Sequence, residues 1–215
     1  MMSANRIRYY KGGLAKRNPP MIVRHDTFRV MPNYRRAFVS GGCWFFAINL
    51  LERRRALLVD HIDSLRESVA STRHKYPFEI DAFVVLPDHM HAIWTLPSGD
   101  ADFSTRWRLI KTAFAKSLPK QERLSEVREA RNERGIWQRR FWEHMIRNET
   151  DYARHIEYCY INPVKHGLVT RVRDWLVTRV RDWPHSSFHR DVEVGIFPLD
   201  WAGDVAATGE FGEAL

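Results

Sequence analysis

The sequence contains few cysteines and no long apolar run, and both absences narrow the class of protein. Its 215 residues include only two cysteines, Cys43 and Cys159, which excludes a disulfide framework or a thiolate metal site and fits a reducing compartment. No apolar run approaches the ~20 residues that a membrane-spanning helix needs, and no signal peptide opens the sequence. We therefore expect a cytoplasmic protein with no membrane partner.

The composition indicates a folded protein with an anionic partner. Hydrophobic residues make up 44% of the chain, enough to bury a substantial core, so wholesale disorder is excluded. The formal net charge is +8, which favours nucleic acid over a membrane surface because no basic amphipathic helix with a long apolar face is present. Charge alone is equally compatible with a generic basic protein.

Two histidines separated by one hydrophobic residue form the most informative motif. The segment 86–96 is apolar and β-branched, with the pattern of a β-strand. Side chains alternate along a strand, so His89 and His91 share one face while Met90 points to the other, and a pair of this kind can chelate one divalent ion. Two ligands do not make a site, and the same pattern also fits a structural pair of histidines.

The remaining pattern predicts an α+β fold. Strands are expected at 43–50, 80–86, the His-Met-His segment and 136–142, and helices at 58–69, 103–114 and 150–162, where Pro163 favours the helix end. This order predicts a ferredoxin-like or RRM-like antiparallel sheet with helices on one face. We divide the chain into a basic, partly disordered extension (1–30), a central domain (31–167) and a C-terminal tail (168–215).

An exact tandem repeat interrupts the C-terminal part. Eight residues, Leu-Val-Thr-Arg-Val-Arg-Asp-Trp, occupy positions 168–175 and again 176–183. Two short copies do not make a solenoid, so we interpret them as a recent duplication or an error in the sequence record. We expect a surface loop to absorb the extra residues.

The third expected helix carries a second half-site. Tyr158 and Asn162 lie four residues apart and are therefore neighbours on one helical surface. If this helix packs beside the histidine strand, Asn162 supplies an oxygen ligand and Tyr158 a nucleophile. Tyr158 could instead be a packing residue, Tyr160 competes for its role, and Asn162 could be a helix cap.

A metal ion and a tyrosine together suit attack on a phosphodiester. The metal ion neutralises the phosphate, and a covalent phosphotyrosine preserves the bond energy for religation. A free tyrosine has a pKa near 10, so attack at neutral pH needs help from the metal, the phosphate or basic neighbours. Arg154, His155 and Lys165 are candidates for those neighbours.

Several motifs in order resemble the REP-associated tyrosine transposases, a single-tyrosine branch of the His-hydrophobic-His nucleases. They are Leu-Pro-Asp-His-Met-His at 86–91, Phe-Trp-Glu-His at 141–144 and Tyr-Cys-Tyr-Ile-Asn-Pro-Val-Lys-His-Gly at 158–167. The resemblance covers roughly residues 34–204. The N-terminal extension and the tandem repeat fall outside the family pattern.

The resemblance implies a metal-dependent enzyme that nicks single-stranded DNA beside a repetitive extragenic palindrome folded as a hairpin. By position, His89 and His91 match the metal-binding pair, Tyr158 the nucleophile and Asn162 the third ligand. It also implies Mg²⁺ or Mn²⁺ as the cofactor, a monomer rather than a dimer, and a nucleoid-associated location.

Basic residues along the chain are candidates for DNA contacts, and two other functions are compatible with the same fold. Candidate phosphate-binding residues are Arg35, Arg36, Arg106, Arg108, Lys111, Arg154 and Lys165. A catalytically silent DNA- or RNA-binding protein on the same fold is one alternative. A metal-dependent hydrolase that uses activated water is another.

Overall fold

The computed structural model describes residues 39–169, 180–203 and 211. Its centre is a four-stranded sheet in the order β2-β3-β1-β4, and every neighbouring pair is antiparallel. The strands are β1 (Cys43–Asn49), β2 (Glu79–Val85), β3 (His89–Thr95) and β4 (Trp142–Met145). This order and the two crossover helices between the strands are those of a ferredoxin-like fold, so the expected α+β class is confirmed.

Two long helices cover one face of the sheet. They are α3 (Ile62–Lys75), which follows the short α2 (Leu57–Asp60), and α4 (Phe103–Ser117). Alternate residues of β1, such as Trp44 and Phe46, point to this face and pack with Trp107 of α4 in a core cluster. The aromatic stripe of α4 therefore has the core role that its helical spacing indicates.

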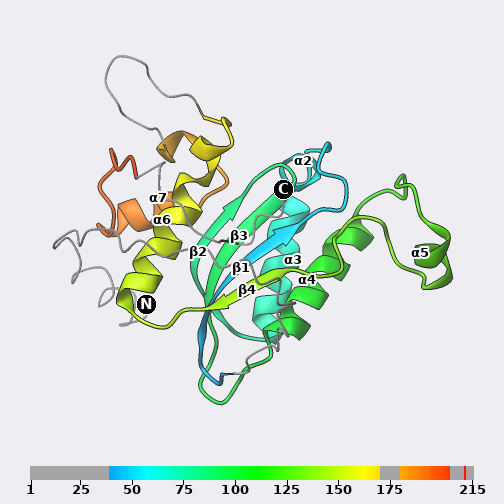
Figure 1. Cartoon of the computed structure of the whole chain (residues 1–215), viewed down its shortest axis with the longest axis horizontal. Helices are drawn as coiled ribbons and strands as arrows, with labels where there is room; N and C mark the ends of the chain where they lie inside the picture. Colours follow the sequence, from blue (N-terminus) through cyan, green and yellow to red (C-terminus); the bar gives the residue numbers. More distant parts are fainter. Residues whose placement is uncertain (1–38, 170–179, 204–210, 212–215) are drawn as a thin grey trace, which may run out of the picture.

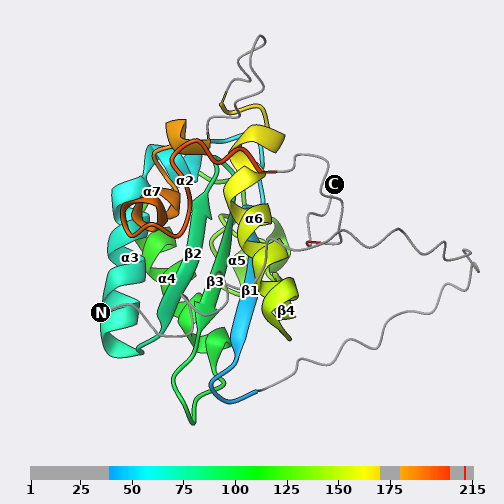
Figure 2. The ribbon, with the colours of Figure 1, turned by 90° about the vertical axis from the view of Figure 1, so that its left-hand side faces the viewer.

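The opposite face is covered by α6 (Glu149–Lys165) (Figures 1 and 2). Phe45 of β1 and Ile93 of β3 point to this side and join Ile156 of α6 in a second core cluster. The expectation that helices occupy one face thus holds for α3 and α4, whereas α6 extends the fold on the other face. A sheet with apolar residues on both faces needs a packing layer on each face. Aromatic and aliphatic residues occupy both alternating sets of positions in β1, so its sequence already indicates two such layers.

The C-terminal residues join the α6 side of the fold. The elements there are η1 (Val180–Asp182) and α7 (Phe188–Glu193). Val180 is fully buried, and the indole Nε1 of Trp183 donates a 2.8 Å hydrogen bond to the Val85 carbonyl. These contacts come from the second copy of the tandem repeat; the loop expected for the repeat falls mainly on 170–179, outside the described residues.

Two element boundaries differ from the expectation. The strand expected at 136–142 lies instead at β4, because Trp137 makes only an isolated bridge to Leu50 and packs in the core beside α4. α6 continues through Lys165 although Pro163 lies inside it. Pro163 removes one donor from the helix, but the His166 amide still bonds the Asn162 carbonyl, so the last turn closes beyond the proline.

Candidate active site

The two histidines lie side by side on β3, on the face that α6 covers. Opposite them on β1, Asn49 pairs with His89 and Ala47 with His91, while Met90 points into the core on the α3–α4 side. The His89 and His91 rings are buried, and their centroids lie 5.2 Å apart at an interplanar angle of 83°. The strand alternation therefore places both imidazoles on one face, as their spacing predicts.

A carboxylate orients the first histidine. The Asp88 Oδ1 atom lies 2.7 Å from the His89 Nδ1 atom, and Arg53 Nε donates to Asp88 Oδ2 at 2.6 Å. Burial alone would raise the pKa of Asp88, but these two hydrogen bonds outweigh it and lower the pKa to about 2. The ionised carboxylate holds the proton on Nδ1 of His89, which leaves the Nε2 lone pair to bind a ligand. Asp88 directly precedes the histidine motif, but residue patterns alone do not reveal this role.

Helix α6 brings Tyr158 to the histidines and carries Asn162 one turn further along. Asn148 caps the helix by accepting the Asp151 amide, and acidic residues occupy the first turn, as helix N-termini favour. The Tyr158 ring lies 5.3 Å from the His91 ring, centroid to centroid. The Asn162 amide nitrogen donates to the Tyr158 carbonyl at 2.9 Å, so its Oδ1 atom faces away from this bond.

The donor set fits a divalent metal ion. Among the described residues, His89 Nε2 and Asn162 Oδ1 are buried atoms with no hydrogen-bond partner. Buried polar atoms in this state are costly unless a ligand satisfies them. Two imidazole nitrogens and one amide oxygen with further open positions suit Mn²⁺, and also Mg²⁺ when water and phosphate complete its shell.

Three further side chains surround Tyr158 and the histidines. The Lys165 Nζ atom lies 4.4 Å from the centre of the Tyr158 ring, and the Phe211 ring stacks on the same tyrosine at 3.7 Å. The His166 ring lies 4.7 Å from His89, so this exposed histidine borders the site. In the sequence, only the position of His166 directly after Lys165 indicated a site role. That position is equally compatible with an ordinary surface residue.

Tyr160, the other candidate tyrosine of α6, has different partners. Its hydroxyl donates a short hydrogen bond to Asp191, which is fully buried, and lies 3.1 Å from the Ser187 hydroxyl. It therefore points toward α7, away from the histidines. The structure brings Tyr158, and not Tyr160, to the histidine pair.

The expected phosphate contacts have different environments. Arg106 is 2% exposed and its guanidinium bonds four acceptors within the fold, so it is a buried structural residue and we drop it from the DNA contacts. Arg108 and Arg154 are exposed, and Lys111 donates to the Gln138 carbonyl at 2.7 Å. Arg35 and Arg36 lie outside the described residues.

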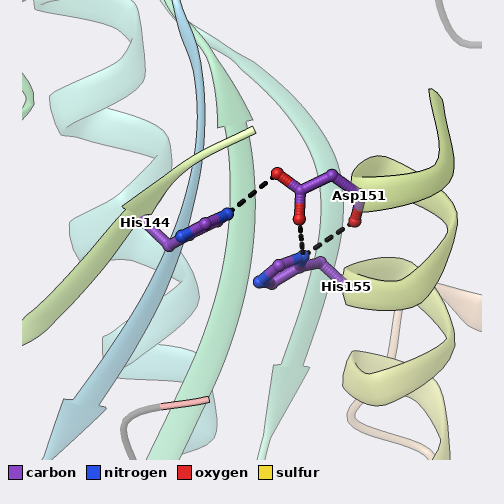
Figure 3. A group of neighbouring side chains, drawn as sticks. All are labelled: His144, Asp151 and His155. Carbon is purple, nitrogen blue, oxygen red and sulfur yellow. Dashed lines mark hydrogen bonds and ion pairs between the residues drawn. The ribbon is translucent and has the colours of Figure 1, made fainter. Parts of the chain in front are cut away.

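A second histidine group lies where β4 meets α6 (Figure 3). His144 Nε2 lies 2.9 Å from Asp151 Oδ2, and His155 Nδ1 lies 2.7 Å from the Asp151 carbonyl and 3.1 Å from Oδ1. Ligand atoms of the three residues lie within 4.8 Å of one another, close enough for one ion. The two rings are nearly parallel, at 12° and 4.5 Å, so their in-plane lone pairs do not converge on a common point. In this arrangement Asp151 bridges two imidazoles and fastens α6 to β4.

The charge state of the bridge follows from burial. Desolvation lowers the pKa of His155 to about 4, so the ring is neutral at neutral pH. Burial would raise the pKa of Asp151, but bonds from His144 and the Arg147 amide outweigh it and lower the pKa. An ionised Asp151 carboxylate that bonds the neutral His155 ring and lies within hydrogen-bond distance of His144 is a stable bridge between the two elements.

The fold and the site together define a class. A ferredoxin-like sheet carries two histidines on a central strand, and a helix on the same face presents a tyrosine and a carboxamide one turn apart. This is the arrangement expected from the resemblance of the sequence motifs to the single-tyrosine His-hydrophobic-His nucleases.

Comparison with known proteins identifies the family. The chain is 51% identical over 175 residues to the REP-associated tyrosine transposase of Escherichia coli K12, which covers 81% of this chain and 93% of that protein. It is 46% identical over 175 residues to a putative REP-associated tyrosine transposase of Haemophilus influenzae, covering 81% of this chain and 95% of that protein. The chain therefore belongs to the REP-associated tyrosine transposases.

A solved structure agrees with this assignment. The REP-associated tyrosine transposase bound to a REP hairpin is 49% identical, with a TM-score of 0.71, and the match covers 86% of this chain and 99% of that one. No model in the protein-family scan matches the chain. Among the described residues, none of the helices combines the length and apolar character that crossing a bilayer demands.

Proposed function

We propose that this protein is a metal-dependent single-strand DNA endonuclease and strand transferase that cuts beside REP hairpins through a covalent bond to Tyr158. The observation that carries the proposal is the meeting of Tyr158 with His91 at 5.3 Å, beside the buried ligand atoms of His89 and Asn162. The hairpin substrate follows from the relative whose structure holds a REP hairpin. We expect the protein to act as a monomer at the nucleoid, as the family resemblance implies.

In the proposed reaction the Tyr158 oxygen forms a bond to phosphorus. The bond from phosphorus to one deoxyribose oxygen breaks, and that oxygen takes up a proton as Tyr158 loses one. His89, His91 and Asn162 would hold a divalent ion, which would neutralise phosphate charge. Asp88 keeps the His89 ring in the orientation that exposes Nε2, because it holds the proton on Nδ1.

Lys165 has a separate role in this scheme. Its ammonium, 4.4 Å from the centre of the Tyr158 ring, stabilises negative charge as it develops on the phenol oxygen. Because Lys165 is exposed, it can also contact the incoming phosphate. Lys165 can thus stabilise the negative charge of the phenol oxygen and that of the phosphate.

Formation of a covalent adduct tests the proposal. The protein is incubated with Mn²⁺ and a labelled DNA hairpin that carries a single-stranded flank, and a denaturing gel is examined for a labelled protein–DNA species. Tyr158→Phe should bind the hairpin and form no adduct, whereas the matched control Tyr160→Phe should keep adduct formation, since Tyr160 bonds Asp191.

Each rival function has its own outcome in the same assay. A silent DNA- or RNA-binding protein binds the hairpin, but the native chain makes neither a nick nor an adduct. A hydrolase that uses activated water nicks the DNA without an adduct, and Tyr158→Phe then keeps cutting. Either result would remove Tyr158 as the nucleophile.

A further inference from the structure

His166 lies at the C-terminal end of α6, where its ring meets the histidine pair of β3. Tyr158, Asn162 and His166 are spaced four residues apart, so they follow one another along one side of the helix. At one end of this row the Tyr158 ring lies 5.3 Å from the His91 ring, and at the other the His166 ring lies 4.7 Å from the His89 ring. Helix α6 therefore presents three side chains in a row to β3, with Asn162 in the middle.

The spacing of the three imidazole rings is that of ligands to one ion. The centre of the His89 ring lies 5.2 Å from that of His91 and 4.7 Å from that of His166. Neighbouring imidazoles that bind one ion at about 2.1 Å have their ring centres roughly 5 Å apart. The His89 ring meets the two other rings at steep angles, 83° and 68°. At such angles the ring edges, which carry the nitrogen atoms, can face a common point.

His166 adjoins both residues that carry an unsatisfied ligand atom. Among the described residues, His89 Nε2 and Asn162 Oδ1 are buried and accept no hydrogen bond. The His166 ring contacts the first of these residues, and the His166 amide donates to the backbone carbonyl of the second at 3.0 Å. An ion that satisfies the two buried atoms would therefore lie beside the His166 side chain.

The helix end holds the backbone of His166 in place although the side chain is exposed. The Gly167 amide donates to the Val164 carbonyl at 3.1 Å and the Leu168 amide to the Pro163 carbonyl at 2.9 Å, the two bonds of a Schellman motif. Gly167 has the positive φ of 68° or less that this motif requires, at 65°. The exposed His166 ring thus extends from a fixed backbone position, at the helix end whose dipole favours a cation.

We infer that His166 is a fourth protein ligand of the divalent ion, together with His89, His91 and Asn162. The inference rests on the proposed function, because it concerns the same metal site, and it adds a ligand that the two-histidine motif does not contain. An octahedral ion with four protein ligands keeps two positions for phosphate oxygens or water. The additional imidazole therefore leaves the substrate access to the ion.

A contact with DNA is the alternative role for an exposed histidine beside Lys165. A residue that binds a phosphate acts only when DNA is present, whereas a metal ligand acts in the protein alone. The decisive measurement is therefore the affinity for Mn²⁺ in the absence of DNA.

The test compares His166→Ala with the control His74→Ala, which replaces an exposed histidine of α3 on the other side of the sheet. The full chain is titrated with Mn²⁺, and the electron paramagnetic resonance signal of the unbound ion gives the dissociation constant. His166→Ala should bind Mn²⁺ at least about tenfold more weakly, since even the loss of a residue that only orients a ligand costs about 10–100-fold. The control should change less than about twofold, as expected for a surface residue far from the ion.

A spectroscopic measurement on the bound ion gives a second, independent readout. Electron spin echo modulation from directly bound nitrogen should be deeper in the native protein than in His166→Ala, because three imidazoles are reduced to two. His166→Gln, which also lacks the ring, should reproduce both changes and replaces the alanine variant if the far-UV spectrum of the latter differs from the native one.

Native Mn²⁺ affinity in His166→Ala, or nitrogen modulation as deep as in the native protein, would overturn the inference. Hairpin affinity measured in EDTA identifies a phosphate contact: a loss there with unchanged Mn²⁺ binding also overturns it. Failure of the proposed function gives a different result, because Mn²⁺ binding then depends on His166 while no adduct forms through Tyr158.

Discussion

Removing the guanidinium of Arg106 should destabilise the protein without acting on DNA directly. This side chain donates to the carbonyls of Tyr76, Pro77 and Asp102 at 2.7–3.2 Å and to the Asp100 carboxylate at 2.6 Å. A carbonyl that loses its donor costs about 1–3 kcal/mol when it is buried, and Tyr76 is half-buried while Pro77 and Asp102 are exposed residues, which favours the lower part of this range. Asp100 is about one-third exposed, so water can solvate its carboxylate when the guanidinium is removed, and the loss of this bond adds little to the change in the free energy of unfolding. The lower part of the range for three carbonyls predicts that Arg106→Ala lowers the free energy of unfolding by about 3–4 kcal/mol.

Arg108 provides a matched control two residues along the same helix. Its side chain is exposed, so Arg108→Ala should change the free energy of unfolding by less than about 0.5 kcal/mol. Urea denaturation followed by circular dichroism measures both variants, and the loss at Arg106 corresponds to a melting temperature about 10 °C lower. Arg106→Lys should recover only part of the stability, because an ammonium cannot reproduce the planar fork.

Stability and hairpin affinity together distinguish a structural Arg106 from one that contacts DNA. If Arg106→Ala keeps native stability within about 1 kcal/mol while its hairpin affinity falls, the guanidinium contacts DNA and is not a structural residue. The reverse pattern, lower stability with native affinity well below the melting temperature, supports the burial argument.

Three further predictions concern the site and its surroundings. Asp88→Asn should weaken Mn²⁺ binding about 10–100-fold in isothermal titration calorimetry, because the partner that orients His89 is lost; unchanged affinity would contradict that role. The pKa of His155 is lowered to about 4, so between pH 6.5 and about 4 the unfolded chain binds a proton that the folded chain does not. Stability should therefore fall as pH decreases through this window, by up to about 1.4 kcal/mol per unit, and His155→Gln should flatten that slope in urea denaturation at pH 7 and 4.5. Phe211 covers the Tyr158 ring, so Phe211→Ala should speed adduct formation on the hairpin with little change in affinity, and a slower rate would show that the ring supports the tyrosine instead.

Local periodicity was sufficient for the parts of the site that lie within one element. Alternation along a strand places His89 and His91 together, and helical spacing places Tyr158 beside Asn162. Residue patterns alone could not establish that the histidine strand and the helix with Tyr158 and Asn162 pack together. It depends on α6 packing on the face opposite to α3 and α4, which is a tertiary property of the sheet.

Burial of charged residues was the main feature that the sequence could not supply. Arg106 and Arg108 have the same residue type and lie on one helix, yet one bonds four acceptors inside the fold and the other is exposed. Their difference arises from the chain around Tyr76 and Pro77, which approaches Arg106 from about thirty residues away. Similarly, β4 lies at 142–145 because Trp137 is drawn into the core, a preference that local β-propensity does not express.

The second copy of the tandem repeat bonds β2 because of the residues that follow it in the chain. Trp183 is bonded to β2 because its copy leads directly into Pro184 and the residues after it, where the His185 carbonyl accepts the Val85 amide and Ser187 bonds Phe83. The other copy leads instead into Leu176. The duplication lengthens the connection between α6 and η1 from six to fourteen residues, for which chain entropy costs less than about 1 kcal/mol. Gaining or losing the eight residues is therefore close to neutral for folding, so selection for stability would neither preserve nor remove them.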